Sequence, residues 1–533
     1  MTSEAPAMGL RGRKWLVLAA CSLGLFMVII DNTVVNIAIA SMIADLKANL
    51  AQIEWVLNAY ALSFAALLIT FGRFGDLYGR RLLFLIGLAV FGVGSAACGL
   101  APNAGALIAF RVFQSVGSAC MLPGTLSLVT VTFPPKERGA AFGIWGAVSG
   151  FAVGIGPTVG GLFTQISWRY IFFINVPIVI FAFIFTLLVV TESRDARKQH
   201  VDWIGVVLSI AFLVTFNYGM IQGPQLEWNA AIIGLIVASG ALFAGFLIWE
   251  RFPMHPLVEL DLWKNRSYAA GNVVAFLLLF AMFGVFFLVP LFLQTILGFG
   301  ALKTGLVIAP MSVALMLVGP PAGRLADKYG PRWLMFAGLL IISAGTLWIS
   351  NLSVTMTLGM LIPRFVLTGV GMGLVISPMT TAVMASVPER RAGGASGVLT
   401  TMRQVGAVMG IAVLGAVLQG QLASAFLTRL TALPGVSGGQ ALEIVQLERQ
   451  SRTGLVGGGA AAAGDVPAVV LGEREARVLR SRLSGAYSLA FIEALSTALR
   501  LSSLVSFAAA LVALGVSANL SAGGGTRAPP EGI

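Results

Sequence analysis

The chain has 533 residues, of which 57% are hydrophobic and 11% charged, and its mean hydropathy is +0.91. This composition excludes a water-soluble globular protein and places the chain in a bilayer. The net charge of +12 would suggest nucleic-acid binding in a soluble protein. In a membrane protein, basic residues instead mark the cytoplasmic loops, so we expect the lipid bilayer and no nucleic acid as a partner.

Fourteen apolar runs are long enough to cross the hydrocarbon core, which takes about 20 helical residues. The predicted spans are 15–39, 54–72, 82–101, 104–131, 140–164, 170–190, 203–221, 230–249, 268–296, 303–323, 332–350, 356–385, 393–418 and 497–520. The first run is too long for a cleaved signal peptide, and we interpret it as a retained signal anchor. The expected fold class is an all-α polytopic membrane protein.

Basic residues are distributed unevenly between the two sets of loops. If the N-terminus is cytoplasmic, the inner segments hold clusters such as Arg80 and Arg81, whereas the short outer loops hold Lys47, Arg169 and Lys303 alone. Because Lys and Arg concentrate in cytoplasmic loops, this pattern predicts a multi-pass protein with both termini in the cytoplasm.

One carboxylate, Asp31, lies well inside a predicted span of the N-terminal half. A charge at mid-bilayer costs about 2.5 to 3.5 kcal/mol on insertion scales, so such a residue is usually functional. At the helical rise per residue, Asp31 and Arg111 lie at similar depths and can neutralise each other. Protonation of Asp31 would then release Arg111 and couple proton binding to a helix rearrangement. The alternative is a static ion pair that fastens two helices.

A charged, glycine-rich turn at residues 72–81 returns at residues 323–332. The repeat predicts two parallel halves of six helices each, as in many secondary transporters. The candidate residues in the two turns are Gly72, Asp76, Gly79, Arg80, Arg81, Arg324 and Asp327.

Small residues recur every four positions at Gly146, Gly150 and Gly154 in the fifth span. This spacing puts them on one helix face, where another helix can approach closely. A proline that can kink the span follows within a further glycine run. That run comprises Gly156, Pro157, Gly160 and Gly161.

The spans 203–221 and 230–249 have no counterpart in the repeat. We therefore predict an N-terminal bundle at 1–200, two inserted helices with a cytoplasmic loop at 201–266, and a C-terminal bundle at 267–533. An outer segment at about 421–495 interrupts the last bundle. Helical patterns at 441–452 and 473–483 flank its glycine- and alanine-rich centre at 457–464, which predicts a loosely structured cap with a flexible middle.

Two embedded arginines of the C-terminal half, Arg364 and Arg403, have no deep carboxylate nearby in their own half. They either bind structural partners such as backbone carbonyls or face a cavity that accepts an anionic or polar substrate group. Glu54 and Glu493, near the outer ends of their helices, are weaker candidates for proton uptake.

The sequence offers no sign of a metal site or an enzyme. His200 and His255 lie far apart in inner loops, and Cys21, Cys98 and Cys120 all fall inside spans, as small buried residues do. The spans and inner loops hold no Ser/His/Asp set, paired carboxylates or nucleotide loop. We expect no metal, no catalytic residues and no cofactor.

Several motifs in order resemble those of the major facilitator superfamily, and within it the fourteen-helix branch of drug/proton antiporters. Residues 72–81 resemble the signature turn between helices two and three, and residues 111–117 the helix-four motif. Residues 150–161 are similar to the helix-five motif associated with antiport, and residues 31–38 to the helix-one motif of this branch. Residues 168–177 resemble another recurring stretch, so the likeness covers nearly the whole chain except the outer segment.

The resemblance implies two six-helix bundles plus two inserted helices. It implies that Asp76 faces the inner end of a helix from the C-terminal half, with Arg80 and Arg138 in a charge network that locks the cytoplasmic side. A carboxylate at a helix N-terminus is favourable on dipole grounds. Asp31 would be the protonation site and Arg111 its coupling partner. The glycines and proline that would seal the halves are Gly150, Gly154, Pro157 and Gly161.

The resulting hypothesis is a proton-coupled exporter of drugs or other small amphipathic compounds, which works by alternating access as a monomer in a bacterial cytoplasmic membrane. The proton gradient would be its energy source. The alternatives are a proton-coupled importer, which the helix-five motif opposes, and a membrane sensor or lipid-handling protein on the same fold. The branch commonly exports lipophilic cations, but the embedded arginines would suit neutral or anionic compounds.

Overall fold

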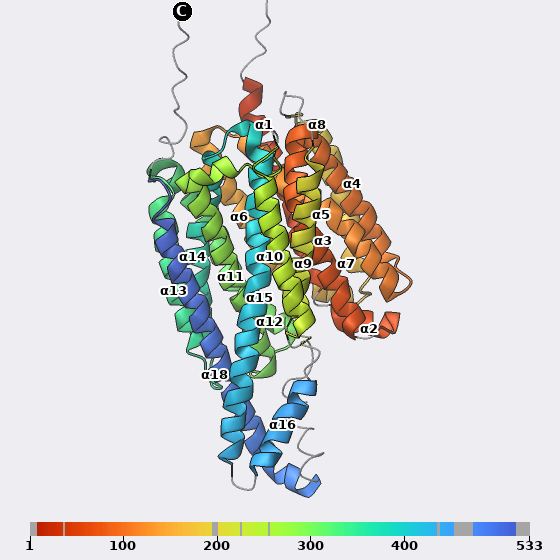
Figure 1. Ribbon diagram of the computed structural model, residues 1–533, viewed down its shortest axis with the longest axis vertical. Helices are drawn as coiled ribbons and strands as arrows, with labels where there is room; N and C mark the ends of the chain where they lie inside the picture. The colour runs from red at the N-terminus through yellow and green to blue at the C-terminus, as the bar shows by residue number, and fades with distance from the viewer. Residues whose placement is uncertain are drawn as a thin grey trace, which may run out of the picture.

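The computed structural model describes residues 8–35, 38–48, 50–194, 201–223, 226, 228–253, 256–433, 437–451 and 473–518. His200, His255 and the stretch 457–464 lie outside the described residues. Apolar helices dominate the described part of the chain (Figure 1).

The helices of the N-terminal half and the insertion run from the first described residue to the end of the second inserted span. They are α1 (Met8–Val35), α2 (Ile39–Leu46), α3 (Leu50–Tyr78), α4 (Arg80–Gly99), α5 (Ala104–Thr132), α6 (Arg138–Thr164), α7 (Tyr170–Phe173), α8 (Asn175–Val189), α9 (Trp203–Gln222) and α10 (Ala230–Trp249). The helices of the C-terminal half follow. They are α11 (Arg266–Thr295), α12 (Ala301–Tyr329), α13 (Arg332–Ser350), α14 (Leu358–Ala385), α15 (Ala392–Thr431), α16 (Gly438–Ser451) and α18 (Glu473–Ala513).

The prediction of fourteen spans is confirmed, because the described residues contain 14 stretches long and apolar enough to cross a membrane. One predicted span, 170–190, is broken into α7 and α8. Pro177 lies in the first turn of α8. Backbone N–H groups in the first turn of a helix make no intrahelical hydrogen bond, so a proline, which has no N–H, is compatible with a helix start there.

The two halves meet along two helix pairs, α6 with α12 and α3 with α15. In Figure 1 the helices of the N-terminal half lie mainly on the right and those of the C-terminal half on the left. The start of α1 and the end of α18 lie at the same end of the molecule, which we call the terminal end. The opposite end carries α2 and α16.

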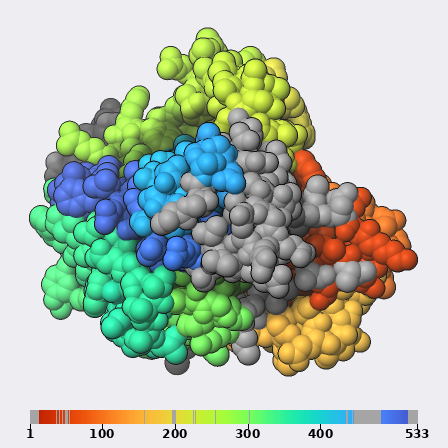
Figure 2. Space-filling view, turned by 90° about the horizontal axis from the view of Figure 1, so that it is seen from below, coloured from red at the N-terminus to blue at the C-terminus, as the bar shows by residue number. Residues whose placement is uncertain are grey.

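The inserted helices lie along one side of the molecule, next to both halves (Figure 2). Helix α9 contacts α3 through the Trp55 and Tyr218 rings, whose centroids lie 5.8 Å apart. It contacts α15 through Met220, which packs with Val408 and Ala412. The insertion therefore covers the α3/α15 side of the interface between the halves and leaves the α6/α12 side uncovered.

The outer segment differs from its prediction as a loosely structured cap. Helices α15 and α18 continue well beyond their predicted spans and project together from the end opposite the terminal end (Figure 1). The Phe426 and Tyr487 rings pack edge to face at 5.5 Å, and Arg429 donates to Glu493 at 2.8 Å. The helical patterns at 441–452 and 473–483 are present as α16 and the start of α18, whereas the packed continuation of α15 was not expected. Burial of the apolar seam between α15 and α18 stabilises both helices over their projecting length.

Candidate functional site

Asp31 on α1 and Arg111 on α5 form a buried ion pair. An Arg111 Nη1 proton is donated to Asp31 Oδ2 at 2.5 Å, and each residue is 1% exposed. The contact expected from their matched depths is therefore present. Because both charges are removed from water, each depends on the other for neutralisation.

Uncharged polar side chains complete the site around Asp31. Asp31 Oδ1 accepts from Gln114 Nε2 at 2.9 Å and from Asn175 Nδ2 at 3.0 Å, and both amides also lie within 3.0 Å of Ser95 Oγ. The side-chain amide oxygen of Gln114, Oε1, accepts from Arg111 Nη1 at 2.7 Å. The carboxylate thus links α1 to α5 and α8 at one point.

The guanidinium of Arg111 is enclosed on its other faces. It lies 4.0 Å from the centroid of the Tyr60 ring and donates to the Val56 carbonyl of α3 at 3.4 Å. A cation over an aromatic face is stabilised by the ring quadrupole. Sequence reasoning missed Tyr60, Gln114 and Asn175, although the latter two fall inside the motifs at 111–117 and 168–177.

Asp76 lies at the terminal end and bridges the two halves. Its two carboxylate oxygens accept from the backbone N–H groups of Gly393 at 2.9 Å and Gly394 at 2.8 Å, in the first turn of α15. Arg80 donates to Asp76 at 2.5 Å and to the Glu389 carbonyl at 2.7 Å. A carboxylate on free N–H groups at a helix N-terminus is favourable both as a hydrogen-bond acceptor and as a charge.

Arg138 joins the same network, since it donates to Glu389 Oε1 at 2.6 Å. The charge network that the resemblance implies is thus present as geometry. Arg81 lies apart from it, because its guanidinium donates to the Leu187 carbonyl within the N-terminal half. The turn itself depends on Gly79, whose φ of 124° disfavours any residue with a Cβ atom.

Asp327 repeats the arrangement on the other side of the interface. Its oxygens accept from the backbone N–H groups of Gly139 at 2.8 Å and Ala140 at 3.0 Å, in the first turn of α6. The neighbouring Arg324 is exposed and makes no ion pair within the described chain. The two halves are therefore fastened at the terminal end by two carboxylates related by the sequence repeat.

Glycines allow the backbones to touch between these two contacts. A Cβ atom on Gly72 would lie 2.6 Å from the Gly393 carbonyl oxygen, and one on Gly143 would lie 2.7 Å from the Gly319 carbonyl oxygen. A separation that short requires backbone to move. The terminal end is consequently closed along both α3/α15 and α6/α12.

The glycine run of the fifth span has a divided role. Cβ atoms on Gly150 and Gly154 would lie 2.7 Å from Leu315 and 2.9 Å from Ser312 of α12, whereas one on Gly156 would meet Thr33 of α1.

A Cβ atom on Gly161 would meet nothing within 4 Å, so Gly161 makes no close contact with the other half in this structure and its role in sealing the halves stays a prediction. Gly161 lies in the last turn of α6, at the end opposite the closed terminal end. Gly160 is buried, and Pro157 lies within α6 with its side chain outside the described part.

The remaining candidate charges lie in different surroundings. Arg403 of α15 donates to Thr380 Oγ1 at 2.5 Å, and its guanidinium lies 5.3 Å from the centroid of the Trp145 ring of α6, between the halves. Arg364 lies near the start of α14 and donates to the Asn351 backbone carbonyl at 2.8 Å. Of the two alternatives for this arginine, a structural backbone partner or a substrate-binding cavity, the structure thus shows a backbone partner.

Glu493 makes the exposed ion pair with Arg429 on the projecting helices, which removes it from the interior. Glu54 lies near the start of α3, and its side chain is outside the described part.

The loop after the inserted helices contributes a residue that sequence reasoning missed. Glu259 contacts Arg73 of α3 at 3.6 Å and also pairs with Arg391, which directly precedes α15. Arg391 pairs with Asp261 at 3.0 Å as well. The insertion thereby supplies an acidic bridge between two basic residues that belong to different halves.

Glu250 anchors the same loop and predicts a pH effect. It is 3% exposed, accepts from the Val258 N–H at 3.1 Å and lies near Asp202. Burial raises the pKa of Glu250 from about 4.5 to about 7. The folded protein therefore holds a proton that the unfolded chain releases, so stability rises as pH falls from about 7 towards 4.5.

We expect Glu250→Gln to be more stable than the wild type at pH 8, by about 2 kcal/mol, with a small difference at pH 5. Thermal unfolding in detergent across this pH range measures the effect. Glu493→Gln, which removes an exposed carboxylate, is the matched control and should leave the pH profile unchanged. Parallel profiles for Glu250→Gln and the wild type would contradict the assignment.

The described residues combine fourteen apolar spans, two halves that meet along α3/α15 and α6/α12, and a buried ion pair inside one half. This architecture is typical of a polytopic membrane transporter. Residues 21–411 match the Major Facilitator Superfamily, and the chain belongs to that family.

Two relatives support this assignment, and one solved structure shares the fold. The chain is 35% identical over 427 residues to the tetracenomycin C resistance and export protein of Streptomyces glaucescens. The aligned region covers 80% of this chain and 79% of the relative. It is 35% identical over 418 residues to the multidrug resistance protein Stp of Mycobacterium tuberculosis, covering 77% and 76%. The crystal structure of the human organic anion transporter MFSD10 has the same fold, with a TM-score of 0.58, 12% identity, and coverage of 90% of this chain and 99% of that one.

Proposed function

We propose that this protein exports small amphipathic compounds of the antibiotic class from the cytoplasm in exchange for protons. Two relatives that match over most of the chain are named resistance or export proteins, which favours efflux. The observation that carries the proton coupling is the buried pair of Asp31 and Arg111, because a membrane-embedded carboxylate is the usual carrier of a transported proton.

Proton binding at Asp31 would rearrange the N-terminal half. The carboxylate neutralises Arg111 and accepts hydrogen bonds from Gln114 and Asn175, on α5 and α8. A protonated Asp31 loses the Coulomb attraction and part of its acceptor capacity, so α1 is released from both helices together. Departure of the proton re-forms the pair and returns the half to the arrangement seen here.

The membrane orientation follows from the basic loops. Positive-inside topology puts the terminal end in the cytoplasm, so the contacts of Asp76 and Asp327 close the cytoplasmic side. The state seen here would then release substrate outward and take up protons from outside. We further propose a bacterial cytoplasmic membrane and a functional monomer, with a single transport path between the halves.

The proposal is tested in inside-out vesicles whose lumen has been acidified. A cationic, a neutral and an anionic antibiotic are added in turn while a pH-sensitive dye reports the lumenal pH. An exchanged substrate draws protons out of the lumen, so we expect the gradient to collapse in vesicles that contain the protein and to persist in empty vesicles. No collapse with any compound, together with unaltered drug uptake, would contradict proton-coupled export.

Arg403 is proposed to set the substrate class, because its half-buried guanidinium lies between Thr380 of the C-terminal half and Trp145 of the N-terminal half. We expect Arg403→Gln to weaken the apparent affinity for anionic compounds about tenfold, the cost of one lost charge-assisted hydrogen bond, and to leave cationic compounds unaffected. Arg364→Gln, near the start of α14, is the matched control. An equal loss for cations and anions would rule out a role in charge selection.

A further inference from the structure

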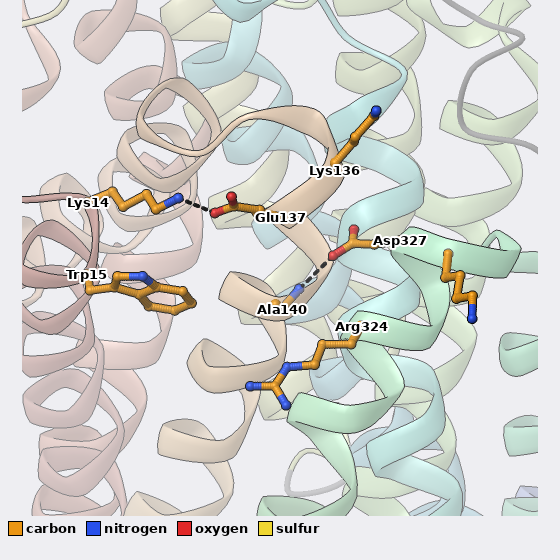
Figure 3. Close-up of a pocket in the computed structure, with 8 residues that line it drawn as sticks. Lys14, Trp15, Lys136, Glu137, Ala140, Arg324 and Asp327 are labelled. Carbon is orange, nitrogen blue, oxygen red and sulfur yellow. Dashed lines mark hydrogen bonds and ion pairs between the residues drawn. The ribbon is translucent and has the colours of Figure 1, made fainter. Parts of the chain in front are cut away.

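A cleft of about 730 Å³ lies at the terminal end, where α1, α6 and α12 approach one another (Figure 3). Its lining includes Lys14 and Trp15 of α1, Lys136 from the turn before α6, and Arg324 and Lys328 of α12. Figure 3 shows Arg324 extending from α12 towards α6, below Asp327. Both halves of the protein therefore contribute basic side chains to one opening.

The acidic residues of the cleft are already occupied. Glu137 pairs with Lys14, and both oxygens of Asp327 accept from the backbone N–H groups of Gly139 and Ala140. Within the described residues, Lys136, Arg324 and Lys328 form no ion pair. The lining thus has four basic side chains against the two carboxylates of Glu137 and Asp327, so positive charge is in excess at the opening.

Comparison of the two repeated turns shows that, among the described residues, Arg324 on the α6/α12 side lacks the acidic partner that its counterpart has. Arg324 is the repeat counterpart of Arg73, since each stands three residues before the aspartate that caps a helix of the opposite half. On the α3/α15 side, Glu259 of the insertion contacts Arg73 and Arg391 and supplies the missing negative charge. Of the inserted helices, α9 packs on α3 and α15 and α10 packs on α9, so the described part of the insertion supplies no equivalent of the Glu259 carboxylate to Arg324 on the α6/α12 side.

We propose that this cleft binds the phosphate of an anionic phospholipid headgroup. Arginine and lysine are the side chains that recognise phosphate, and basic pockets at the cytoplasmic ends of membrane helices bind such headgroups. Trp15 lines the cleft, and further exposed apolar side chains stand next to lining residues on the same helices, namely Leu16, Leu325 and Tyr329. A phospholipid matches both the basic residues and the apolar side chains, because its phosphate lies among the basic residues while its acyl chains cover the apolar surface. A free phosphate matches the basic residues alone.

Lipid binding at this place would depend on the conformation of the protein. Lys136 belongs to the N-terminal half, whereas Arg324 and Lys328 belong to the C-terminal half, so opening of the terminal end separates the groups that share the phosphate. A ligand that binds one conformation more tightly shifts the population towards it. The bound lipid therefore favours the state in which the terminal end is closed.

Lipid retention by the purified full-length protein tests the proposal. Native mass spectrometry counts the phosphatidylglycerol and phosphatidylcholine molecules that remain bound when equal mixtures are titrated into detergent. The wild type should retain phosphatidylglycerol preferentially. Lys136→Gln/Lys328→Gln should lower its apparent affinity roughly tenfold or more, on the scale expected for two basic residues near a lipid surface. Lys47→Gln/Lys303→Gln, which removes two charges from the opposite end, should match the wild type.

Two results would overturn the proposal. Retention of phosphatidylglycerol by Lys136→Gln/Lys328→Gln at the wild-type level would place the lipid elsewhere. Inorganic phosphate is also titrated to millimolar concentrations against the bound phosphatidylglycerol. If phosphate half-saturates the site at the same concentration as the lipid does, the site recognises a free anion and not a headgroup. Thermal unfolding of both double variants checks that they are folded. The measurement involves no transport, so its outcome is independent of whether the protein exchanges drugs for protons.

Discussion

Asp31→Asn is expected to abolish drug-driven proton release while the protein still reaches the membrane. The substitution keeps the size of the side chain but removes both the titrating group and the charge that neutralises Arg111. Inside-out vesicles with an acid lumen measure the effect, and the signal of the variant should fall to that of empty vesicles. A wild-type response would show that the pair only fastens α1 to α5.

The same substitution also leaves Arg111 buried without its partner, which costs about 3 to 5 kcal/mol of stability. Loss of activity could therefore reflect unfolding. In Asp31→Asn/Arg111→Gln the buried site is neutral, so thermal stability should recover while proton release stays absent. Asp45→Asn is the matched control, because it removes only the exposed ion pair with Arg169 and keeps an oxygen that can accept from Trp168 Nε1, so neither quantity should change measurably. Proton release by the double variant would exclude Asp31 as the proton site.

The features that a bilayer penalises were the ones that could be predicted from the sequence. Fourteen apolar runs were recognisable because each span must satisfy its backbone within a helix of fixed minimum length. Asp31 and Arg111 were recognisable because embedded charges are costly, and their shared depth followed from the helical rise. The position of Asp76 at a helix end of the other half was implied by the family resemblance, whereas the matching contact of Asp327 with α6 was not anticipated.

The remainder depended on tertiary packing. Gln114 and Asn175 are uncharged, so their cost in a span is too small to distinguish them from other polar residues before the fold brings them to Asp31. Glu259 lies in a loop, where a carboxylate is ordinary until the insertion is placed between the halves. The start of α18 was recognisable as a helical pattern at 473–483, but its pairing with the extended end of α15, through Phe426 and Tyr487, depends on the tertiary fold.

Asp76→Ala should shift the protein towards the conformation in which the terminal end is open. Asp76 and Arg80 both belong to the N-terminal half, so their mutual ion pair persists in either conformation and does not set the balance. Opening instead breaks the two hydrogen bonds that Asp76 accepts from Gly393 and Gly394 of the other half. Each hydrogen bond to a charged group contributes about 1.5 to 3 kcal/mol, so removal of both should move the equilibrium by roughly 100-fold or more.

Spin labels at Tyr78→Cys and Trp333→Cys measure this shift, because both positions are more than half exposed at the terminal end of opposite halves, while Cys21, Cys98 and Cys120 are buried. Asp76→Ala should replace the short label distance by a longer one. Asp261→Ala removes an exposed carboxylate from the same end and should leave the short distance dominant. If Asp76→Ala also keeps the short distance, the backbone contacts at Gly72 and Gly143 suffice to hold the halves together, and the carboxylate is not the element that balances the two conformations.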